Sequence, residues 1–223
     1  MVWGMERIGS GIYGPYGSFP GQQERLEAIE RQMSAEKNAE YGSLGYAAFV
    51  NESIHKDNGP LPEDALPKRF VAKQRYNALG SLLLIARGVR AVDEKLKDII
   101  ERLEPGVHQF WPLQIVMPNG DEYPVQYYGM MVLRRLGSFR PDQSDPNCFL
   151  GQDIAPGIRS YSSYGVSKKI NAGLAMSKAV FGNSHLWREQ ELRTPTLLLS
   201  DALIAEIKKA GLKIPKHFPL KEV

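Results

Sequence analysis

The most regular pattern of hydrophobic positions along the chain is a helical one over residues 92–103. Its apolar side chains share one helical face and are Val92, Leu96, Ile99, Ile100 and Leu103. Asp93 is expected to be the N-cap, because its carboxylate can accept hydrogen bonds from the first free backbone N–H groups. The Pro105-Gly106 pair then ends the helix.

A second helix is predicted near the C-terminus. Residues 196–199 indicate a buried strand, Ser200 is a suitable N-cap, and residues 201–210 have the apolar spacing of a helix. Gly211 is expected to end this helix in the left-handed conformation that favours glycine.

A β-hairpin is predicted after the first helix. Residues 108–117 are rich in aromatic and β-branched side chains, and residues 122–136 are expected to continue as a second, long strand. The Asn119-Gly120 pair between them favours the positive φ that a tight hairpin turn requires.

The remaining segments have weaker patterns. Residues 70–76 indicate a strand and residues 81–86 a short buried segment, whereas residues 137–160 are predicted to be a loop. Residues 165–182 favour a short helix. Gly and Pro punctuate residues 1–21, so that an irregular arm is expected there.

These elements predict an α+β fold with one compact domain, antiparallel hairpins, amphipathic helices and an irregular N-terminal arm. Residues 22–40 are predicted to form a polar surface helix and residues 41–67 a loop. We therefore divide the chain into residues 1–60, with the arm, the polar helix and the loop, and residues 61–223, with the α+β domain.

Two parts of the chain resemble each other. The first is Val92-Asp93, a helix and Phe110-Trp111-Pro112-Leu113; the second is Ser200-Asp201, a helix and His217-Phe218-Pro219-Leu220, with a shift of one residue in the connecting loop. The two parts are either generic capped helices or copies of one duplicated helix–strand unit.

Composition places the protein among ordinary globular chains. It has 223 residues, 43% of them hydrophobic and 24% charged. The single cysteine, Cys148, excludes an intramolecular disulfide and a cysteine metal cage. Neither a signal peptide nor a membrane-spanning apolar stretch is visible, so that a soluble, cytoplasmic protein is expected.

The net charge of +3 is unevenly distributed. Residues 1–60 carry 5 basic and 8 acidic side chains, and residues 61–223 carry 23 basic and 17 acidic ones. Because the basic residues are scattered, we expect a solvated surface rather than a nucleic-acid-binding face. The basic body favours an acidic contact surface on a protein partner.

No catalytic or metal-binding constellation is recognisable. The four histidines, none of them at metal-ligand spacing, are His55, His108, His185 and His217. Cys148 has no predicted base beside it, and no nucleophile elbow or phosphate loop occurs. We therefore expect no catalytic residue, no metal and no cofactor, and a structural role for His108, Gln109 and Trp111.

Residues 159–188 combine aromatic and basic side chains. This combination suits stacking on single-stranded nucleic acid, but Tyr, Trp and Arg also dominate protein interfaces, which we favour. The expected partner-binding residues are Tyr161, Tyr164, Lys168, Lys169, Trp187 and Arg188.

Several sequence blocks resemble a bacterial family of polymorphic toxin systems, immunity-protein family eleven, first described as a domain of unknown function. The blocks are residues 103–113 (LEPGVHQFWPL), the Asn119-Gly120 turn, and residues 185–188 (HLWR), 199–203 (LSDAL) and 210–212 (AGL). The resemblance runs from about Leu66 to Leu220. Residues before 60 match less well.

The resemblance implies that residues 61–223 form an immunity-type domain and that the protein is an antitoxin, not an enzyme. Such a protein binds a cognate toxin domain in the cytoplasm and blocks its active site. The toxin belongs to a type VI or another contact-dependent system, and many toxins paired with this family look like nucleases. An enzyme with an unrecognised active site and a nucleic-acid-binding module are the alternatives.

Overall fold

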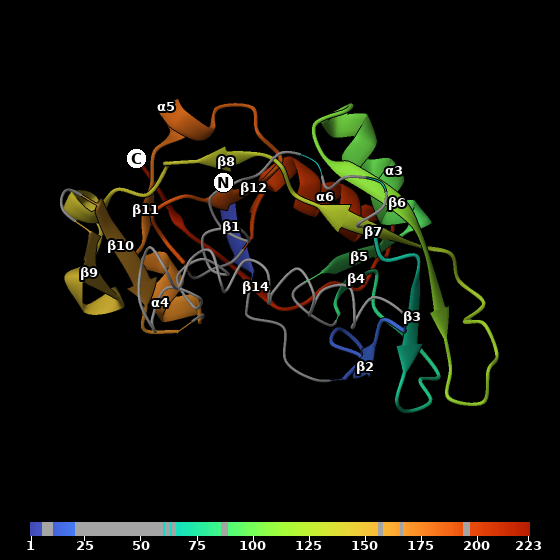
Figure 1. Cartoon of the computed structure of the whole chain (residues 1–223). Helices are drawn as coiled ribbons and strands as arrows, with labels where there is room; N and C mark the ends of the chain where they lie inside the picture. Colours follow the sequence, from blue (N-terminus) through green and yellow to red (C-terminus); the bar gives the residue numbers. More distant parts are fainter. Residues whose placement is uncertain are drawn as a thin grey trace.

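Two mixed sheets form the framework of the protein, and the chain passes from one into the other between strands β7 and β8 (Figure 1). The computed structural model describes residues 1–5, 11–20, 60, 63, 66–85, 89–155, 158–165, 167–193 and 197–223. The strands are β1 (Val2–Met5), β2 (Gly17–Ser18), β3 (Arg69–Ala72), β4 (Leu82–Leu84), β5 (Arg90–Asp93), β6 (Gln109–Val116), β7 (Tyr127–Met131), β8 (Arg135–Leu136), β9 (Phe149–Ala155), β10 (Ile158–Ser163), β11 (Ala175–Met176), β12 (Leu186–Glu189), β13 (Leu198–Ser200), β14 (His217–Pro219) and β15 (Lys221–Glu222). The helices are α3 (Glu94–Leu103), α4 (Lys168–Ala172), α5 (Lys178–Phe181) and α6 (Asp201–Lys209), with the short 3-10 turns η4 (Pro141–Gln143) and η5 (Pro146–Cys148). This combination confirms the predicted α+β class.

The two sheets repeat one arrangement of elements. Their strand orders are β2-β3-β6-β7-β5-β4 and β14-β1-β13-β12-β8. In the first, β5, α3 and β6 follow one another along the chain, and β7 lies antiparallel between β5 and β6. In the second, β13, α6 and β14 follow one another, and β1 lies antiparallel between β13 and β14. The structure therefore favours a duplicated unit over two generic capped helices.

The pairing registers of the two units also agree. Gly129 of β7 lies opposite Trp111 of β6, and Gly4 of β1 lies opposite Phe218 of β14. Each aromatic residue belongs to the aromatic-Pro-Leu motif that the sequence repeats. The equivalence of the two motifs is thus a property of the sheets as well as of the sequence.

The alignment of the two units differs by one residue from the one predicted. Asp93, not Val92, is equivalent to Ser200, because each is an N-cap whose side chain accepts a hydrogen bond from the third residue of its helix, Leu96 or Leu203. Val92 lies in β5 rather than in the helix. With this alignment the N-cap and the aromatic residue of the motif are equally far apart in both units, from Asp93 to Trp111 and from Ser200 to Phe218, and no shift is needed.

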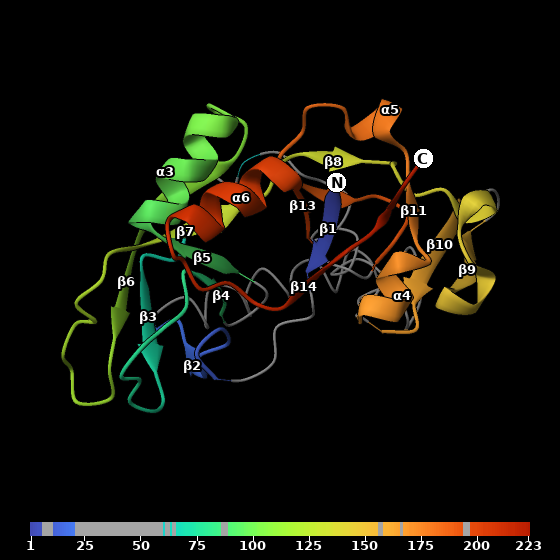
Figure 2. The same ribbon diagram turned by 180° about the vertical axis from the view of Figure 1, so that it is seen from behind.

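Helices α3 and α6 lie side by side on the same side of the molecule (Figure 2). Leu96 of α3 and Leu203 of α6 are each 1% exposed and belong to one hydrophobic core, to which both sheets contribute. Arg102 and Glu206 form an exposed ion pair between the two helices at 2.6 Å. None of the described helices is long and apolar enough to cross a membrane. Burial of the shared core joins the two units.

The first residues of the chain do not form the irregular arm that we expected. Val2–Met5 is a central strand, and the side chains of Val2 and Met5 are 0% and 1% exposed. The partners of β1 are strands close to the C-terminus, so that no local pattern reveals the pairing. The polar helix predicted over residues 22–40, and most of the loop predicted over 41–67, lie outside the described residues.

The long strand predicted over residues 122–136 is divided between the two sheets. Its hairpin with β6 is confirmed, with Gly120 at φ 90° in the turn. β7 remains in the six-stranded sheet, whereas β8 pairs in parallel with β12 of the other sheet. The sequence pattern is continuous because both pieces are partly buried, and it does not show the change of sheet.

Residues 137–160 are not a single loop, as we expected. They include η4, η5 and strand β9, which forms an antiparallel hairpin with β10. The helix predicted over residues 165–182 is two short helices, α4 and α5, with β11 between them. Small and polar residues dominate the hairpin sequence, so that its strands show no clear hydrophobic alternation.

We predict that Gly129→Ala destabilises the protein. A Cβ atom at Gly129 would overlap the ring of Trp111, which is 4% exposed and donates from Nε1 to the carbonyl oxygen of Pro67 at 2.9 Å. Such overpacking costs about 1–3 kcal/mol of unfolding free energy, measurable by urea denaturation. Gly137→Ala is the matched control, because the nearest atom to its Cβ would be 3.4 Å away. Equal losses in the two variants would contradict the prediction.

Candidate functional site

The six residues expected to bind a partner lie in different environments. Trp187 has no exposed surface and stacks on Phe181, with ring centroids 5.4 Å apart. Tyr161 is half-buried and packs edge-on against Phe139 and Phe149. The side chain of Trp187 therefore lies in the core, and that of Tyr161 lies at its edge.

Arg188 belongs to a group of arginines where the two sheets meet. It lies opposite Arg135 on the neighbouring strand β8. Burial and the charge of Arg135 lower the pKa of Arg188 to about 10. Burial and the charges of Arg188 and Arg135 lower the pKa of Arg90 to about 9. Arg188 is thus placed apart from the exposed candidates, in a partly buried cluster of like charge.

Tyr164, Lys168 and Lys169 lie at the surface. Tyr164 is 61% exposed and directly follows β10. The two lysines begin α4, which Ser167 caps by accepting a hydrogen bond from the backbone N–H of Ile170. Of the six expected residues, these three are exposed.

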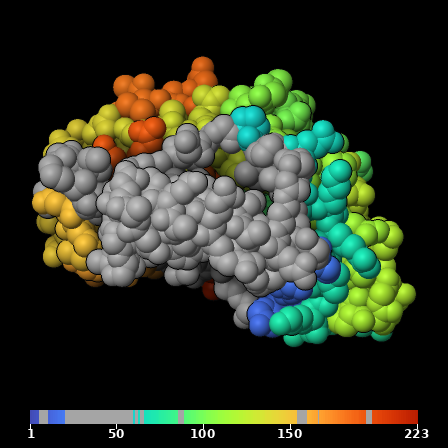
Figure 3. All heavy atoms as spheres, in the orientation of Figure 1, coloured from blue at the N-terminus to red at the C-terminus, as the bar shows by residue number. Residues whose placement is uncertain are grey.

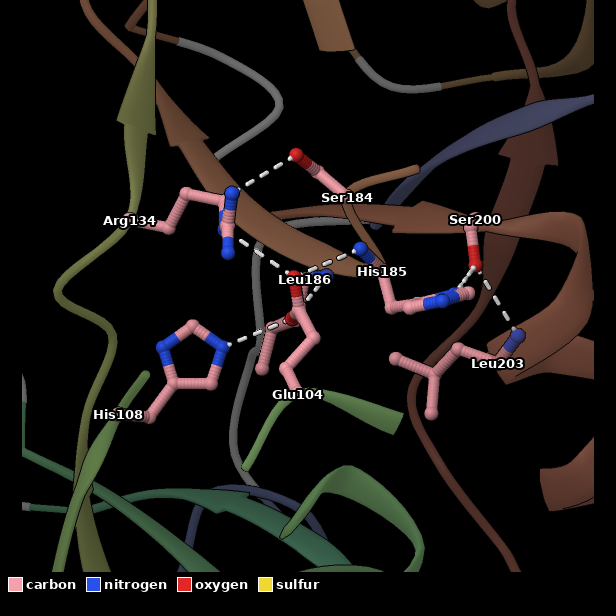
Figure 4. Close-up of polar contacts among 8 residues, drawn as sticks. All are labelled: Glu104, His108, Arg134, Ser184, His185, Leu186, Ser200 and Leu203. Carbon is pink, nitrogen blue, oxygen red and sulfur yellow. Dashed lines mark hydrogen bonds and ion pairs between the residues drawn. The ribbon is translucent and has the colours of Figure 1, made fainter. Parts of the chain in front are cut away.

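A second candidate site is a buried polar cluster around Glu104, just after α3 (Figure 4). Its Oε1 accepts a hydrogen bond from the backbone N–H of His185 at 3.0 Å. Its Oε2 accepts from the backbone N–H of Leu186 at 2.9 Å and from Nε2 of His108 at 3.0 Å. Arg134 forms an ion pair with Oε1 at 3.1 Å. Nitrogen donors therefore surround a carboxylate whose side chain is 3% exposed.

The Glu104 carboxylate connects the two duplicated units. It follows the helix of the first unit, whereas His185 directly precedes and Leu186 begins β12, the strand that pairs with β13 of the second unit. A reciprocal contact runs the other way: the carbonyl oxygen of Lys213, after the second helix, accepts from the backbone N–H of Ser81 at 2.7 Å. Ser81 precedes β4 as His185 precedes β12. The two contacts are thus related by pseudo-symmetry but use different acceptors. The acceptor after α3 is the buried carboxylate of Glu104, and the acceptor after α6 is the backbone carbonyl of Lys213.

The surroundings of Glu104 favour its ionised form. Burial raises the pKa of this carboxyl group, but the hydrogen bonds from His108 and His185 and the charges of His108 and Arg134 outweigh it. The net effect lowers the pKa from its ordinary value of 4.5. Glu104 is therefore a fixed negative charge at neutral pH, and it is unsuited to donating a proton.

Ser200, His185 and Glu104 lie close together in Figure 4 without forming a catalytic triad. Nδ1 of His185 is 2.8 Å from Oγ of Ser200, but that oxygen also accepts from the backbone N–H of Leu203 as the cap of α6. Glu104 binds the backbone of His185 and orients the ring of His108 instead. Since the side chains of Glu104 and His108 are 3% and 0% exposed, a substrate does not reach them in this conformation.

The described residues contain no group of three or more His, Cys, Asp or Glu side chains placed to hold a metal ion. Cys148 is 4% exposed, and burial raises the pKa of its thiol. A neutral, buried thiol is a poor nucleophile. The Glu104 cluster therefore has a structural role, in which one buried charge holds α3, β12 and His108 together.

Sequence patterns give Glu104 and Arg134 no role, because charged residues are ordinarily solvated. The local signals are the spacing of four residues between Glu104 and His108 and the position of both in the family-like block 103–113. As whole residues, His108 and Trp111 are 6% and 4% exposed, as the structural role predicted for them requires, and Gln109 is half-buried on β6.

We predict that Glu104→Gln destabilises the protein strongly. The amide removes the negative charge and places an NH2 group among donors, and the loss of one partner from a buried ion pair costs about 3–5 kcal/mol. Chemical denaturation measures this loss. Glu206→Gln, which removes an exposed ion pair with Arg102, is the control and should lower the unfolding free energy far less. A similar, small loss in both variants would show that the Glu104 contacts do not stabilise the fold.

The lowered pKa of Glu104 should also make the unfolding free energy depend on pH. Because the pKa of Glu104 is lower in the folded than in the unfolded chain, its contribution is complete above about pH 4.5 and is lost as the pH falls through the folded value. The difference in unfolding free energy between the wild type and Glu104→Gln should therefore narrow below pH 4.5. Denaturation at a series of pH values tests this, and a constant difference would contradict it.

Comparison with known proteins gives a family for the chain. A family described as "Immunity protein family (Imm11)" matches residues 22–216, which include both helices of the duplicated units, the Glu104 cluster and the β9–β10 hairpin. No curated protein matches the chain. An immunity family points to a protein with a toxin as its partner and to a role other than catalysis. The resemblance seen in the sequence is confirmed, and the chain belongs to the immunity protein family Imm11.

Proposed function

We propose that the protein is an antitoxin that binds a cognate secreted bacterial toxin in the cytoplasm and blocks its active site. Membership of the immunity family is the observation that carries this proposal. The toxin is a nuclease effector of a type VI or another contact-dependent system, as the family resemblance implies. No cofactor, metal or membrane takes part in this function.

The construction of the fold supports a binding role. A protein that blocks another by contact needs a rigid surface, because ordering flexible groups on binding costs affinity. The shared core of α3 and α6 and the buried charge of Glu104 fix the two units relative to one another. Exposed side chains on this scaffold are then preorganised for a partner.

An enzyme is the second candidate, and the Glu104–His108 pair is the observation that favours it, since a carboxylate that orients a histidine is a component of general base catalysis. Such an enzyme would have to open the core to admit a substrate. The variant His108→Asn separates the two candidates. If it still protects cells against the toxin, the result favours the antitoxin.

We expect a stable one-to-one complex with the toxin domain encoded beside this gene. Co-expression followed by size-exclusion chromatography should show co-elution at micromolar concentration, with an interface of about 1,600 Å² in total. Tight binding is required because one free toxin molecule turns over many times.

A toxin domain from an unrelated system is the control and should elute alone. Cells that produce the cognate toxin domain should survive only when they also produce this protein. Separate elution of the cognate pair, or death of cells that produce both, would refute the antitoxin function.

A further inference from the structure

The β9–β10 hairpin is firmly attached to the body through its inner face. Phe149 of β9 and Tyr161 of β10 pack against Phe139, with ring centroids 5.3 Å apart in each case. The backbone of Tyr161 also donates to the carbonyl oxygen of Glu191 and accepts from the N–H of Arg193, both at 2.8 Å. A hairpin is marginally stable alone, but these contacts hold this one in place.

The opposite face of the hairpin is exposed at Leu150 and Gln152, whereas Ser160, which alternation also places there, is 9% exposed. Successive side chains alternate between the faces of a strand, so that Leu150 and Gln152 point away from the aromatic cluster. Leu150 lies opposite Ser162, and Tyr164, two residues further on, is its diagonal neighbour. Leu150 is 56% exposed and Tyr164 61%. These four residues, Leu150, Gln152, Ser162 and Tyr164, are the outer hairpin face.

Basic side chains border the outer hairpin face. Lys168 and Lys169 follow Tyr164 in α4, and Arg193 donates from Nε to Oγ of Ser160 at 2.9 Å. Asp145 also lies near this border, and the hydrogen bonds from Asn147 and the charge of Lys169 lower the pKa of its carboxyl group. Glu191, whose carbonyl oxygen accepts from the backbone N–H of Tyr161, is a second acidic residue at the border. The segment that follows Tyr164 carries two adjacent positive charges, Lys168 and Lys169.

The hairpin also has a suitable position for contact. Its residues form the surface at one end of the molecule, on the left in Figure 3, far from the end that β6 and β3 form on the right. A rigid, protruding element with an aromatic residue, a leucine and lysines offers the apolar centre and charged rim of a protein interface.

We propose that the outer hairpin face, bordered by Lys168 and Lys169, is the surface that binds the toxin domain, and that it takes an acidic patch with an apolar hollow for Leu150 and Tyr164. This inference rests on the proposed antitoxin function. Compared with the expected contact set, this surface leaves out Trp187, Tyr161 and Arg188, which are buried or half-buried. It keeps the exposed residues of that set and adds Leu150, which is also exposed.

Binding of the full-length protein to the purified toxin domain tests the proposal. The double variant Leu150→Ala/Tyr164→Ala should bind roughly 100-fold more weakly, as is typical of central contact residues. Its melting temperature should equal that of the wild type, because both side chains are exposed. Val125→Ala/Tyr16→Ala is the matched control, with similar side chains that are 44% and 65% exposed elsewhere, and it should bind like the wild type.

A second variant, Lys168→Glu/Lys169→Glu, tests the charge of the partner without touching the apolar pair. It should lower the association rate by about tenfold or more, with a smaller effect at high salt. If the alanine variant fails to fold, the association rate of the charge-reversal variant still tests whether this surface binds the toxin.

The outcomes separate the surface from the function. If the wild type binds and both hairpin variants bind equally well, the surface is wrong and the antitoxin function stands. If the wild type itself does not bind, the function fails and the surface with it. If the lysine variant binds the toxin normally but loses binding to a labelled single-stranded oligonucleotide, the basic border serves nucleic acid and the proposal is overturned.

Discussion

The ionised carboxylate of Glu104 is the contact on which the arrangement of the two halves depends. A buried charge is costly unless donors surround it, and the donors here come from the first unit, from the second unit and from the segment between the two sheets. The charge is therefore stable only when both units are in place. Together with the shared hydrophobic core, these hydrogen bonds fix the position of β12 relative to α3.

The duplicated unit explains why the chain ends are side by side. Each unit needs a strand between the two that flank its helix, and the first takes the next strand of the chain, β7. The second takes β1 from the N-terminus, and the terminal amino group lies 2.7 Å from the carboxylate of Glu222. The extra elements inserted between the units, among them the β9–β10 hairpin, are then free to carry a function that the framework does not need.

Local patterns predicted the elements whose stabilising contacts are close in sequence. Helices α3 and α6, the caps Asp93 and Ser200 and the Gly120 turn fall in this class. Strand β1 and the β9–β10 hairpin were not predicted, since the first depends on partners at the other end of the chain and the second consists largely of small and polar residues. Glu104 is separated from the amide of His185 by 81 positions, and no periodicity in one sequence connects them. Family membership could be predicted, because short motifs carry it, but the exposure of candidate contacts could not.

Native-state hydrogen exchange of the backbone amides of His185 and Leu186 tests the role of Glu104 most directly. Both amides donate to its carboxylate, so that they should exchange only when the protein unfolds globally, as slowly as the amides in the core of β13. In Glu104→Gln the same two amides should exchange much faster than the amides of α3. Rapid exchange of His185 and Leu186 in the wild type, or unchanged exchange in the variant, would contradict the account.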